Sequence, residues 1–549
     1  MTLVPRTEPA GPRDAAPESL SWPFAGGKVR DIGVGGASVA APLAAAGPGE
    51  VVARVDAVCV CSSDVKIIRM GVQHPLFNAR DLAASPVILG HEMAVTVVDV
   101  GRDWRDRFAP GQRLGVQPAM TVGGKRATIG MDLPGGFSQH IRLDARMLDR
   151  SNPYVFPIPD GLSAAAGAML EPYSCVEAAY RPNCRTSPQP GGTLLVVGRP
   201  DGQDATLALD LRVARAVLVD APPALARWAR EHAAEVEEPA SLAEAVAGRS
   251  FDDIILCGGL SPADAAILLP ALANGGLFTL ASATADAAPV PVDVARIHYH
   301  AVSIVGTRGP AVEAAFDAAR NRFDLRPGGT ALILGAGGAM GRIHTHRALE
   351  LENGPAMVIA TSRKGPRRDA LERDFGPLAR ARGKTLVVVE DDGLNARLPA
   401  LAPGGCDDVV VVAPDVAAVE RGAKLMRADG LLVVFSGMPF GQPCSLPLGL
   451  VASHGARFTG STGSLVEDQL AVLRRVTDQG LDLTGNLEAV AGFDALPEAL
   501  EAVMEGRVSG KVAIYPALRT MPLTPVRDLK RTMADKTWTV ADEARLLGA

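Results

Sequence analysis

Four short segments of this sequence occur twice, in the same order. Residues 191–198 (GGTLLVVG) return as residues 328–335 (GGTALILG), at an offset of 137 residues. Three later pairs have an offset of 154 or 155 residues: 251–255 with 406–410, 274–278 with 428–432, and 303–309 with 457–463. One insertion accounts for the change in offset. The repeat therefore predicts two copies of one domain in tandem.

Within each copy, short apolar runs alternate with glycine turns and with stretches of helical periodicity. We interpret each copy as strand, glycine turn, helix, strand and further alternating elements. This order is typical of a doubly wound parallel sheet, the Rossmann type of α/β fold. We expect one such domain at residues 181–310 and a second at residues 311–464.

The second copy has a turn suited to a dinucleotide. A pyrophosphate binds at a helix N-terminus, and glycines let it approach the backbone amides. Residues 335–341 (GAGGAMG) follow an apolar strand and precede a helix-like stretch at 342–351. The predicted cofactor contacts in this turn are Gly335, Gly337, Gly338, Met340 and Gly341.

The first copy lacks such a turn. Residues 198–204 (GRPDGQD) contain Pro200, which has no amide to donate, and Asp201 and Asp204, which would repel a pyrophosphate. We therefore expect a degenerate copy. Asp220, after the predicted strand 216–219, is either an acceptor for a ribose hydroxyl or an ordinary turn residue.

The type of nicotinamide cofactor depends on the residues after the next strand of the second copy, predicted at 357–360. Thr361, Ser362, Arg363 and Lys364 follow it, so the acid of a strict NAD site is missing and two cations could meet a 2′-phosphate. We expect Ser362, Arg363 and Lys364 to contact the cofactor, with NADP(H) preferred and NAD(H) possible. The alternative is that both cations are solvated charges at the start of a helix.

The N-terminal part has the pattern of a small β-barrel. Short β-branched runs are separated by glycine and proline turns. We expect a leader without order at residues 1–27, the barrel domain at 28–180, and a return of the chain to it at 465–549. The predicted strands are 29–34, 51–60, 87–89, 94–100, 113–117 and 137–143.

Two strand ends in this region carry metal-binding residue types. Cys61 follows the β-rich run 50–60, and Gly90, His91 and Glu92 follow an apolar strand. A thiolate, an imidazole and a carboxylate suit Zn²⁺, which keeps one position open when it is catalytic. The predicted ligands are Cys61, His91 and Glu92, the last as ligand or close neighbour. The plain alternative is a solvated His–Glu pair and a cysteine packed in the core.

These residues resemble the motifs of the zinc-dependent medium-chain dehydrogenase/reductase family, the alcohol and polyol dehydrogenases. The resemblance implies a GroES-like barrel, a cofactor domain, a catalytic zinc and hydride transfer between NAD(P) and a hydroxyl or ketone of a polyol or sugar phosphate. An extra Rossmann copy departs from the family. The chain looks most like the L-sorbose-1-phosphate reductase group, through Cys61-x-Ser63 with Lys66, Gly90-His91-Glu92, Gln117-Pro118-Ala119-Met120, Glu171-Pro172 and Met521-Pro522-Leu523-Thr524.

The same resemblance assigns further roles. Glu171 is expected near the metal, which it could bind directly, through water, or alternately with a substrate oxygen. Cys175, one turn later, is the competing ligand. Ser63 matches the family's proton-relay hydroxyl, or else caps a turn. Lys66 is a candidate contact to a polar substrate, or an exposed lysine. Because no cysteine lies between Cys61 and Cys175, the four-cysteine structural zinc is missing, and we expect one zinc per chain.

Composition narrows the function classes. The net charge of −6 argues against a nucleic-acid binder, and the longest apolar runs fall short of the roughly 18 residues that span a bilayer. Seven scattered cysteines form no disulfide framework, so a reducing cytoplasm is expected. The expected partner is a small-molecule substrate, with no nucleic acid and no membrane. The chain is expected to be a monomer with an internal pseudo-dimer, or a homodimer.

Two other functions remain open at this point. A tightly held nicotinamide could oxidise a sugar transiently, so that elimination or epimerisation follows without net redox change. A protein that only binds nucleotide, without catalysis, is the other possibility, although the candidate metal ligands argue against it.

Overall fold

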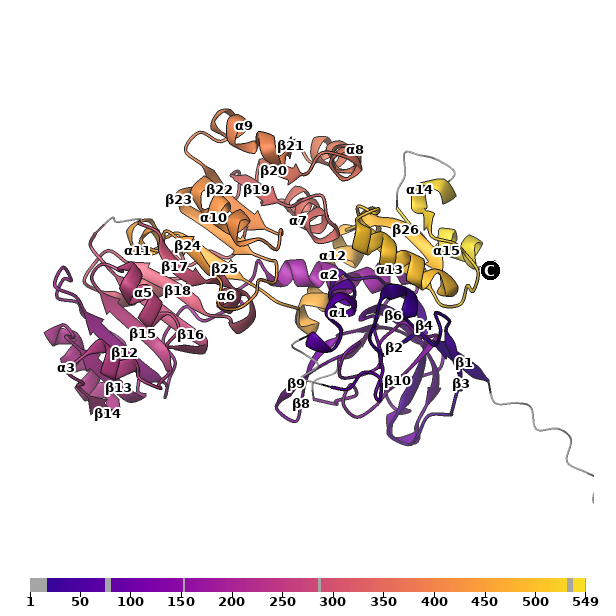
Figure 1. Cartoon of the computed structure of the whole chain (residues 1–549), viewed down its shortest axis with the longest axis horizontal. Helices are drawn as coiled ribbons and strands as arrows, with labels where there is room; N and C mark the ends of the chain where they lie inside the picture. Colours follow the sequence, from indigo (N-terminus) through magenta and orange to yellow (C-terminus); the bar gives the residue numbers. More distant parts are fainter. Residues whose placement is uncertain (1–16, 75–79, 152–153, 285–287, 531–536, 549) are drawn as a thin grey trace, which may run out of the picture. The chain divides into compact units, whose positions relative to one another are not determined.

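The computed structural model describes residues 17–74, 80–151, 154–284, 288–530 and 537–548 (Figure 1). The chain divides into two units. Residues up to 171 and from 482 onward form the first unit, and residues 172–481 form the second. None of the described helices is long and apolar enough to cross a membrane.

The first unit is built on an eight-stranded sheet that is mostly antiparallel. Its order is β11-β7-β6-β4-β27-β26-β28, and β10 also pairs with β4. Strand β27 comes from near the end of the chain and pairs with β4 at Ala513 with Cys59. The strands are β4 (Val51–Cys59), β6 (Glu92–Val100), β7 (Arg113–Val116), β10 (His140–Leu143), β11 (Val155–Pro157), β26 (Leu487–Gly492), β27 (Lys511–Tyr515) and β28 (Thr524–Pro525).

Short strand pairs and helices complete the first unit. The pairs join β1 to β3, β2 to β5 and β8 to β9. Their bounds are β1 (Glu18–Ser21), β2 (Pro23–Phe24), β3 (Val39–Pro42), β5 (Val87–Ile88), β8 (Ala119–Val122) and β9 (Lys125–Thr128). The helices are α1 (Ser62–Met70), α13 (Leu496–Glu505), α14 (Val526–Leu529) and α15 (Val540–Leu547), while α2 (Ala164–Ala178) begins in this unit and ends in the second.

The N-terminal region differs from the sequence-based expectation in two places. Strands β1 and β2 occupy part of the predicted leader, whose residues 1–16 lie outside the described residues. The strand predicted at 29–34 is wrong, because Val29–Asp31 is a 3-10 helix. Asp31 accepts a hydrogen bond from the Lys28 amide and so favours this turn over an extended backbone.

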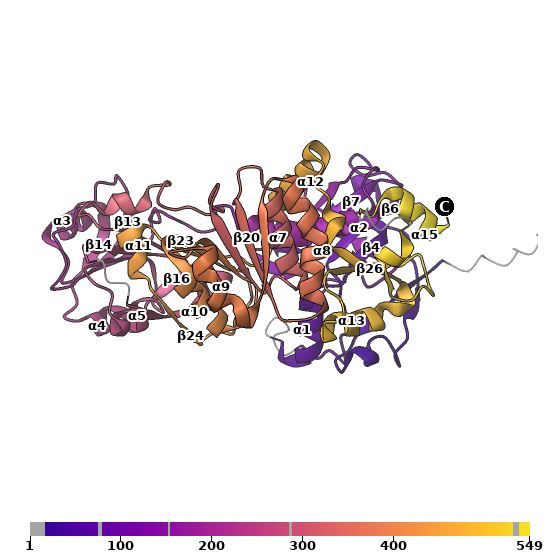
Figure 2. The ribbon, with the colours of Figure 1, turned by 90° about the horizontal axis from the view of Figure 1, so that it is seen from above.

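The second unit contains two six-stranded parallel sheets with the same strand order (Figures 1 and 2). The first has the order β14-β13-β12-β15-β16-β18 and the second β21-β20-β19-β22-β23-β25. The first comprises β12 (Thr193–Gly198), β13 (Val213–Val219), β14 (Ala233–Glu237), β15 (Phe251–Cys257), β16 (Leu272–Ala281) and β18 (Ser303–Thr307). The second comprises β19 (Thr330–Leu334), β20 (Met357–Ser362), β21 (Thr385–Glu390), β22 (Cys406–Val411), β23 (Met426–Val434) and β25 (Arg457–Gly460).

Helices pack on both sheets, and Figure 2 shows α7 and α8 lying alongside each other. The helices of the first sheet are α3 (Pro223–His232), α4 (Leu242–Val246), α5 (Pro262–Leu268) and α6 (Val294–His300). Those of the second are α7 (Ala339–Glu350), α8 (Pro366–Ala381), α9 (Leu394–Leu401), α10 (Val416–Leu425) and α11 (Gly449–His454). Helix α12 (Val466–Gln479) follows β25, and its Arg475 forms an ion pair with Glu177 of α2.

The two sheets differ after their first strands. Helix α7 connects β19 to β20, but residues 199–212 connect β12 to β13 without a helix. Ala205 and Leu207 of this segment are buried in the core of the first sheet, and Trp228 Nε1 donates to the Leu209 carbonyl at 3.0 Å. The predicted strand–turn–helix order is therefore wrong for the first copy, because an extended apolar segment covers the sheet where a helix was expected.

The two sheets share one apolar core. Strand β17 (Val290–Asp293) pairs antiparallel with β24 (Pro443–Leu446), which joins the first sheet's region to the second's. The buried Arg457 guanidinium on β25 donates to the Ile304 carbonyl on β18 at 2.7 Å. The contacts between the sheets therefore combine apolar packing, strand pairing and a buried hydrogen bond.

Candidate metal centre and nucleotide site

The register of two strands brings the predicted metal ligands together. Cys61 lies just after β4 and caps the N-terminus of α1, while Glu92 begins β6. Strands β4 and β6 pair with Cys59 opposite Glu92. One ligand atom from each of Cys61, His91 and Glu92 lies within 4.8 Å of the others. The structure thus gathers three of the four predicted ligands.

Gly90 permits the sharp turn that presents His91. Its φ is +87°, and a Cβ added there would lie 2.6 Å from the Phe137 ring. Any other residue is therefore disfavoured at this position, because the positive φ strains an L residue and the Phe137 ring occupies the space of its Cβ.

Asp64 orients the imidazole of His91. This buried carboxylate accepts from the Cys61 amide at 2.9 Å and from the Gly90 amide at 3.3 Å, and its Oδ1 lies 3.4 Å from His91 Nδ1. Nε2, on the other side of the ring, faces Ser63 and Cys61, and a carboxylate at Nδ1 is the usual partner of a histidine that binds metal through Nε2. Burial works against the charged imidazole, but Asp64 and Cys61 raise the pKa of His91 well above its ordinary value.

Glu92 is held by a residue that the sequence did not reveal. Lys511 on β27 donates to Glu92 Oε1, and both side chains are buried. The other oxygen, Glu92 Oε2, is buried and has no hydrogen-bond partner among the described residues. A sulfur, a nitrogen and an unpartnered carboxylate oxygen at one point fit the donor set that zinc accepts.

The other predicted residues of this region lie around the group of three. Ser63 Oγ is 3.3 Å from His91 Nε2, and Lys66 is exposed on α1. Glu171, buried on α2, is outside the group whose ligand atoms all lie within 4.8 Å of one another. Burial raises the pKa of the Cys59 thiol, and Glu92 and Glu171 add to this rise through their charge.

The predicted cofactor turn connects β19 to α7. Gly335 has a φ of +86°, and Gly338 is the N-cap of α7. A Cβ on Gly337 would lie 2.3 Å from Ser362 Oγ, and one on Gly341 would lie 2.4 Å from the Gly335 carbonyl. Glycine at 335, 337 and 341 therefore keeps the turn closed against β20 and leaves the amides of the helix N-terminus bare, while Met340 lies in its first turn.

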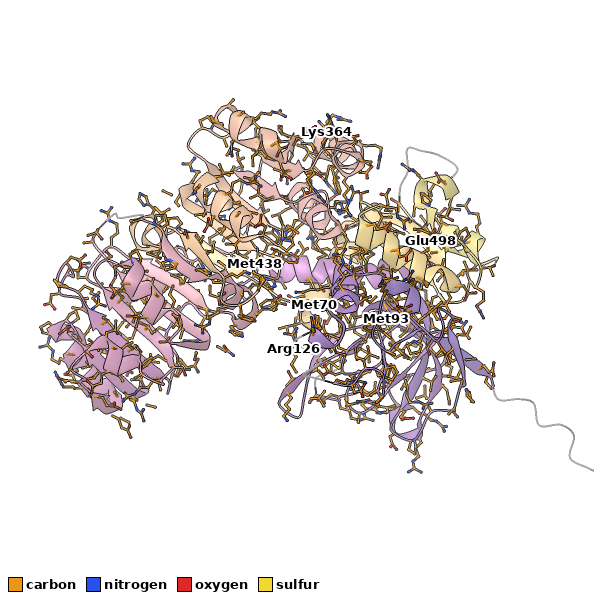
Figure 3. All side chains as sticks on the ribbon, viewed as in Figure 1. Met70, Met93, Arg126, Lys364, Met438 and Glu498 are labelled. Carbon is orange, nitrogen blue, oxygen red and sulfur yellow. The ribbon has the colours of Figure 1, made fainter. Side chains whose placement is uncertain are left out.

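Cations follow Ser362 at the end of β20. Arg363 and Lys364 are exposed, and Figure 3 labels Lys364 near α8. Partial burial lowers the pKa of Arg367, and the charge of Arg363 lowers it further, so these two guanidinium groups lie near each other. A positive group beside Ser362 and the Gly337 turn is suited to a phosphate on the adenosine ribose.

The corresponding edge of the first sheet is filled by its own side chains. Asp201 accepts from the Gly259 amide at 3.0 Å, and Arg199 forms an ion pair with Asp264. A Cβ on Gly198 would lie 1.9 Å from the carbonyl of Asp220, whose own φ is +47°. Among the described residues no helix begins directly after β12, so the helix N-terminus that would receive a pyrophosphate at this position is missing.

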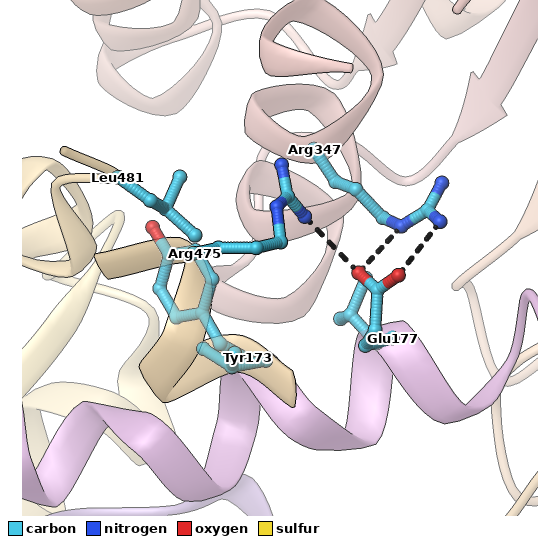
Figure 4. Close-up of a pocket in the computed structure, with 7 residues that line it drawn as sticks. Tyr173, Glu177, Arg347, Arg475 and Leu481 are labelled. Atoms are coloured by element: carbon cyan, nitrogen blue, oxygen red, sulfur yellow. Dashed lines mark hydrogen bonds and ion pairs between the residues drawn. The ribbon is translucent and has the colours of Figure 1, made fainter. Parts of the chain in front are cut away.

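Helix α7 carries a set of buried polar residues, and Figure 4 shows one of them, Arg347, beside Glu177 of α2. Glu177 of α2 accepts from Arg347 of α7 at 2.9 Å and from Arg475 of α12 at 3.2 Å. Tyr173 and Tyr180 hydroxyls lie 2.7 Å from Nδ1 of His346 and His344, respectively. The cavity beside these groups has room for about one water molecule. It is therefore too small for a substrate, and the network fixes α7 against α2.

Comparisons with known proteins agree with this description. Residues 47–153 match the alcohol dehydrogenase GroES-like domain. The L-sorbose 1-phosphate reductase of Klebsiella pneumoniae is 27% identical over 294 residues, which cover 47% of this chain and 69% of that protein. A protein of Agrobacterium fabrum named "Putative D-xylulose reductase" is 30% identical over 287 residues, which cover 48% of this chain and 76% of that protein.

Solved structures share the fold. The 2R,3R-butanediol dehydrogenase of Bacillus subtilis has a TM-score of 0.53 at 15% identity, covering 91% of this chain and 99% of that one. A "putative zinc-binding dehydrogenase" of Sinorhizobium meliloti, solved with NADP, has a TM-score of 0.51 at 17% identity, covering 91% of this chain and 100% of that one. From the family motifs, the domain match and these relatives, the chain belongs to the zinc-dependent medium-chain dehydrogenase/reductase family, the alcohol and polyol dehydrogenases.

Proposed function

We propose that this protein is a zinc-dependent oxidoreductase that transfers a hydride between NAD(P) and a hydroxyl or ketone of a polyol or sugar phosphate. The observation that carries the proposal is the convergence of Cys61, His91 and Glu92, where one buried oxygen of Glu92 has no hydrogen-bond partner in the part of the chain that the structure describes. The relatives named for L-sorbose 1-phosphate and D-xylulose suggest the substrate class.

In this proposal, the chain's own residues hold and orient the reacting groups. Cys61, His91 and Glu92 would hold zinc, with Glu171 as a further ligand. Bound zinc would supply a Lewis acid toward a substrate oxygen. Asp64 fixes the His91 ring, Lys511 holds one oxygen of Glu92, and Ser63 is positioned to take up or donate the proton of the substrate hydroxyl. Lys66 is a candidate contact to a substrate phosphate.

We assign the cofactor to the second sheet. The turn 335–341 would hold the pyrophosphate, and Ser362, Arg363 and Lys364 would contact the adenosine ribose, with NADP(H) preferred and NAD(H) possible. The first copy is taken as a duplicate that has lost this ability, because residues 199–212 contain no helix.

The domain organisation follows from the same interpretation. We assign the catalytic domain to residues 28–180 and 465–549, and the two Rossmann copies to 181–310 and 311–464. Pairing of β17 with β24 supports a monomer in which the first copy takes the place of a partner subunit. Sedimentation should then give one chain per particle, whereas a homodimer would contradict this arrangement.

NADPH absorbance tests the activity. The protein should oxidise NADPH stoichiometrically when ketose phosphates such as L-sorbose 1-phosphate are added, and should reduce NADP with the matching polyol phosphate. C61S should lose this activity, while C444S, altered at a buried cysteine of the second unit, should keep it. Product formed without net cofactor consumption would instead indicate an epimerase or lyase.

A further inference from the structure

The strand order of the second sheet fixes where the two halves of a bound dinucleotide would lie. The order reverses between β19 and β22, and ligands of such sheets bind across this point at the carboxyl ends of the strands. Ser362 places the adenosine half beside β20. The nicotinamide half must then extend the other way, over the ends of β22, β23 and β25. This step rests on the proposed cofactor site.

Helix α6 of the first sheet is attached to those strand ends. His298 Nδ1 lies 3.1 Å from the carbonyl of Val434, the last residue of β23. A Cβ on Gly460, which ends β25, would lie 2.9 Å from His298 Cα, so the two backbones are in close contact. The attachment places the C-terminal end of α6 at the carboxyl edge of the second sheet.

One carboxylate joins α6 to the loop that follows β23. Asp293 Oδ1 accepts from the Ala295 amide at 3.1 Å and caps α6, while Oδ2 accepts from the Gly441 amide at 3.0 Å. The loop preceding Gly441 contains Phe440, and it leads from β23 to β24. Because one side chain holds both segments, the beginning of this seven-residue helix and the Phe440 loop have a fixed mutual position.

The two segments form an aromatic cluster with an unsatisfied polar atom. The His300 ring stacks on Phe440 at 4.9 Å between centroids, and Tyr299 lies 5.4 Å from the same ring. Phe440 is 53% exposed. His300 Nδ1 is buried and has no hydrogen-bond partner among the described residues. Partial burial and the charge of Arg296 lower the pKa of His300, so its imidazole is neutral at pH 7 and can either donate or accept.

We propose that Tyr299 and His300 of the first sheet, together with Phe440 of the second, form the subsite for the nicotinamide riboside half of NAD(P). Phe440 and Tyr299 provide aromatic surface, and His300 provides a hydrogen-bonding nitrogen for a ribose hydroxyl or the carboxamide. The first copy, which has no pyrophosphate turn of its own, then completes the cofactor site of the second copy. The first copy would thus take part in cofactor binding, although its own sheet edge is filled by side chains and cannot hold a cofactor.

The test compares a whole cofactor with its adenosine half. Calorimetry would measure binding of NADPH and of adenosine 2′,5′-bisphosphate to the full chain and to H300F, which preserves ring stacking and removes the polar nitrogens. We expect H300F to weaken the binding of NADPH about 3- to 10-fold, which is the effect of losing one hydrogen bond, and to leave the affinity for the bisphosphate unchanged. H300Q should recover part of the NADPH affinity, and H454F, at an exposed histidine of α11, should change neither ligand.

The outcomes separate this inference from the function on which it rests. Equal affinities of H300F and the native chain for NADPH would overturn the subsite. An equal loss for both ligands would also overturn it, since the substitution would then act through the fold. If the native chain bound neither ligand, the assignment of the cofactor to the second sheet would itself fail.

Discussion

Lys511 and Glu92 form a buried ion pair although 419 positions separate them in the sequence. The pair joins β27, near the end of the chain, to the first residue of β6 beside Cys61 and His91. Removing one partner of a buried pair leaves the other charge without compensation, which typically costs about 3 kcal/mol. We therefore expect K511M to lower the free energy of unfolding by about that amount and to reduce zinc retention.

A double substitution provides the control for Lys511. E92Q/K511M removes both charges, so its unfolding free energy should be higher than that of K511M, although its zinc content should stay low. Denaturant unfolding and metal analysis measure the two quantities. If K511M unfolded like the native chain, the pair would not stabilise the first unit.

The second prediction concerns the glycine turn. G337D should abolish nucleotide binding, because even a Cβ at this position would lie 2.3 Å from Ser362 Oγ and a carboxylate would repel the pyrophosphate. Zinc content should not change. G376A, at a glycine within α8 whose added Cβ would make only a normal contact at 3.5 Å, is the matched control. NADPH fluorescence gives the readout, and retained binding by G337D would exclude this turn as the pyrophosphate site.

The third prediction concerns cofactor choice. Replacing both Arg363 and Lys364 with alanine should weaken the binding of NADPH about 10-fold and leave the binding of NADH almost unchanged. The reason is that hydrogen bonds to a charged phosphate contribute about 1.5–3 kcal/mol to binding. K424A, at an exposed lysine of α10, should alter neither affinity. Equal effects on NADPH and NADH would show that these cations do not recognise a 2′-phosphate.

The fourth prediction is a pH dependence of stability. Burial lowers the pKa of His344 to about 3, and the nearby Arg347 adds to the shift. The unfolded state therefore binds a proton below pH 6.5 that the folded state does not, and stability falls with decreasing pH between 6.5 and about 3. Between pH 7.5 and pH 5, protonation of this histidine in the unfolded state should lower the free energy of unfolding by about 2 kcal/mol.

H344N isolates that contribution. Asparagine can still form a hydrogen bond with the Tyr180 hydroxyl but cannot titrate. The free energy of unfolding of the variant should therefore fall by about 2 kcal/mol less than that of the native chain over the same pH interval. Urea unfolding at the two pH values measures the difference. Parallel pH profiles for both proteins would mean that His344 is not the titrating group.

Much of the fold could be predicted from the sequence because it depends on local patterns. The predicted strand 51–60 is β4 (Val51–Cys59), and the helix-like stretch 342–351 falls mostly within α7. Cys61 and His91 were identifiable as metal-binding residue types beside strands, and the antiparallel pairing of β4 with β6 brings the end of β4 to the beginning of β6. Gly335, Gly337 and Gly341 of the turn stand where the backbone conformation or a close neighbour excludes a side chain, whereas Gly338 has open space around it.

The remaining features depend on contacts between distant segments. Nothing around Lys511 in the sequence indicates a buried partner at Glu92. Proline and acidic residues at 198–204 indicated a first copy without a pyrophosphate turn, but not the missing helix or the packing of Ala205 and Leu207 in its place. His298 and His300 lie where α6 meets the second sheet, a position that depends on the pairing of β17 with β24 and not on the local sequence.

Metal analysis of the purified chain tests whether Cys61, His91 and Glu92 bind zinc. Native protein and C444S should each contain about one zinc per chain, as expected for a catalytic site without a second structural ion. C61S and H91N should contain almost none while remaining folded by circular dichroism. A native chain without zinc, or a C61S variant that retains it, would contradict the assignment of Cys61, His91 and Glu92 as the metal centre.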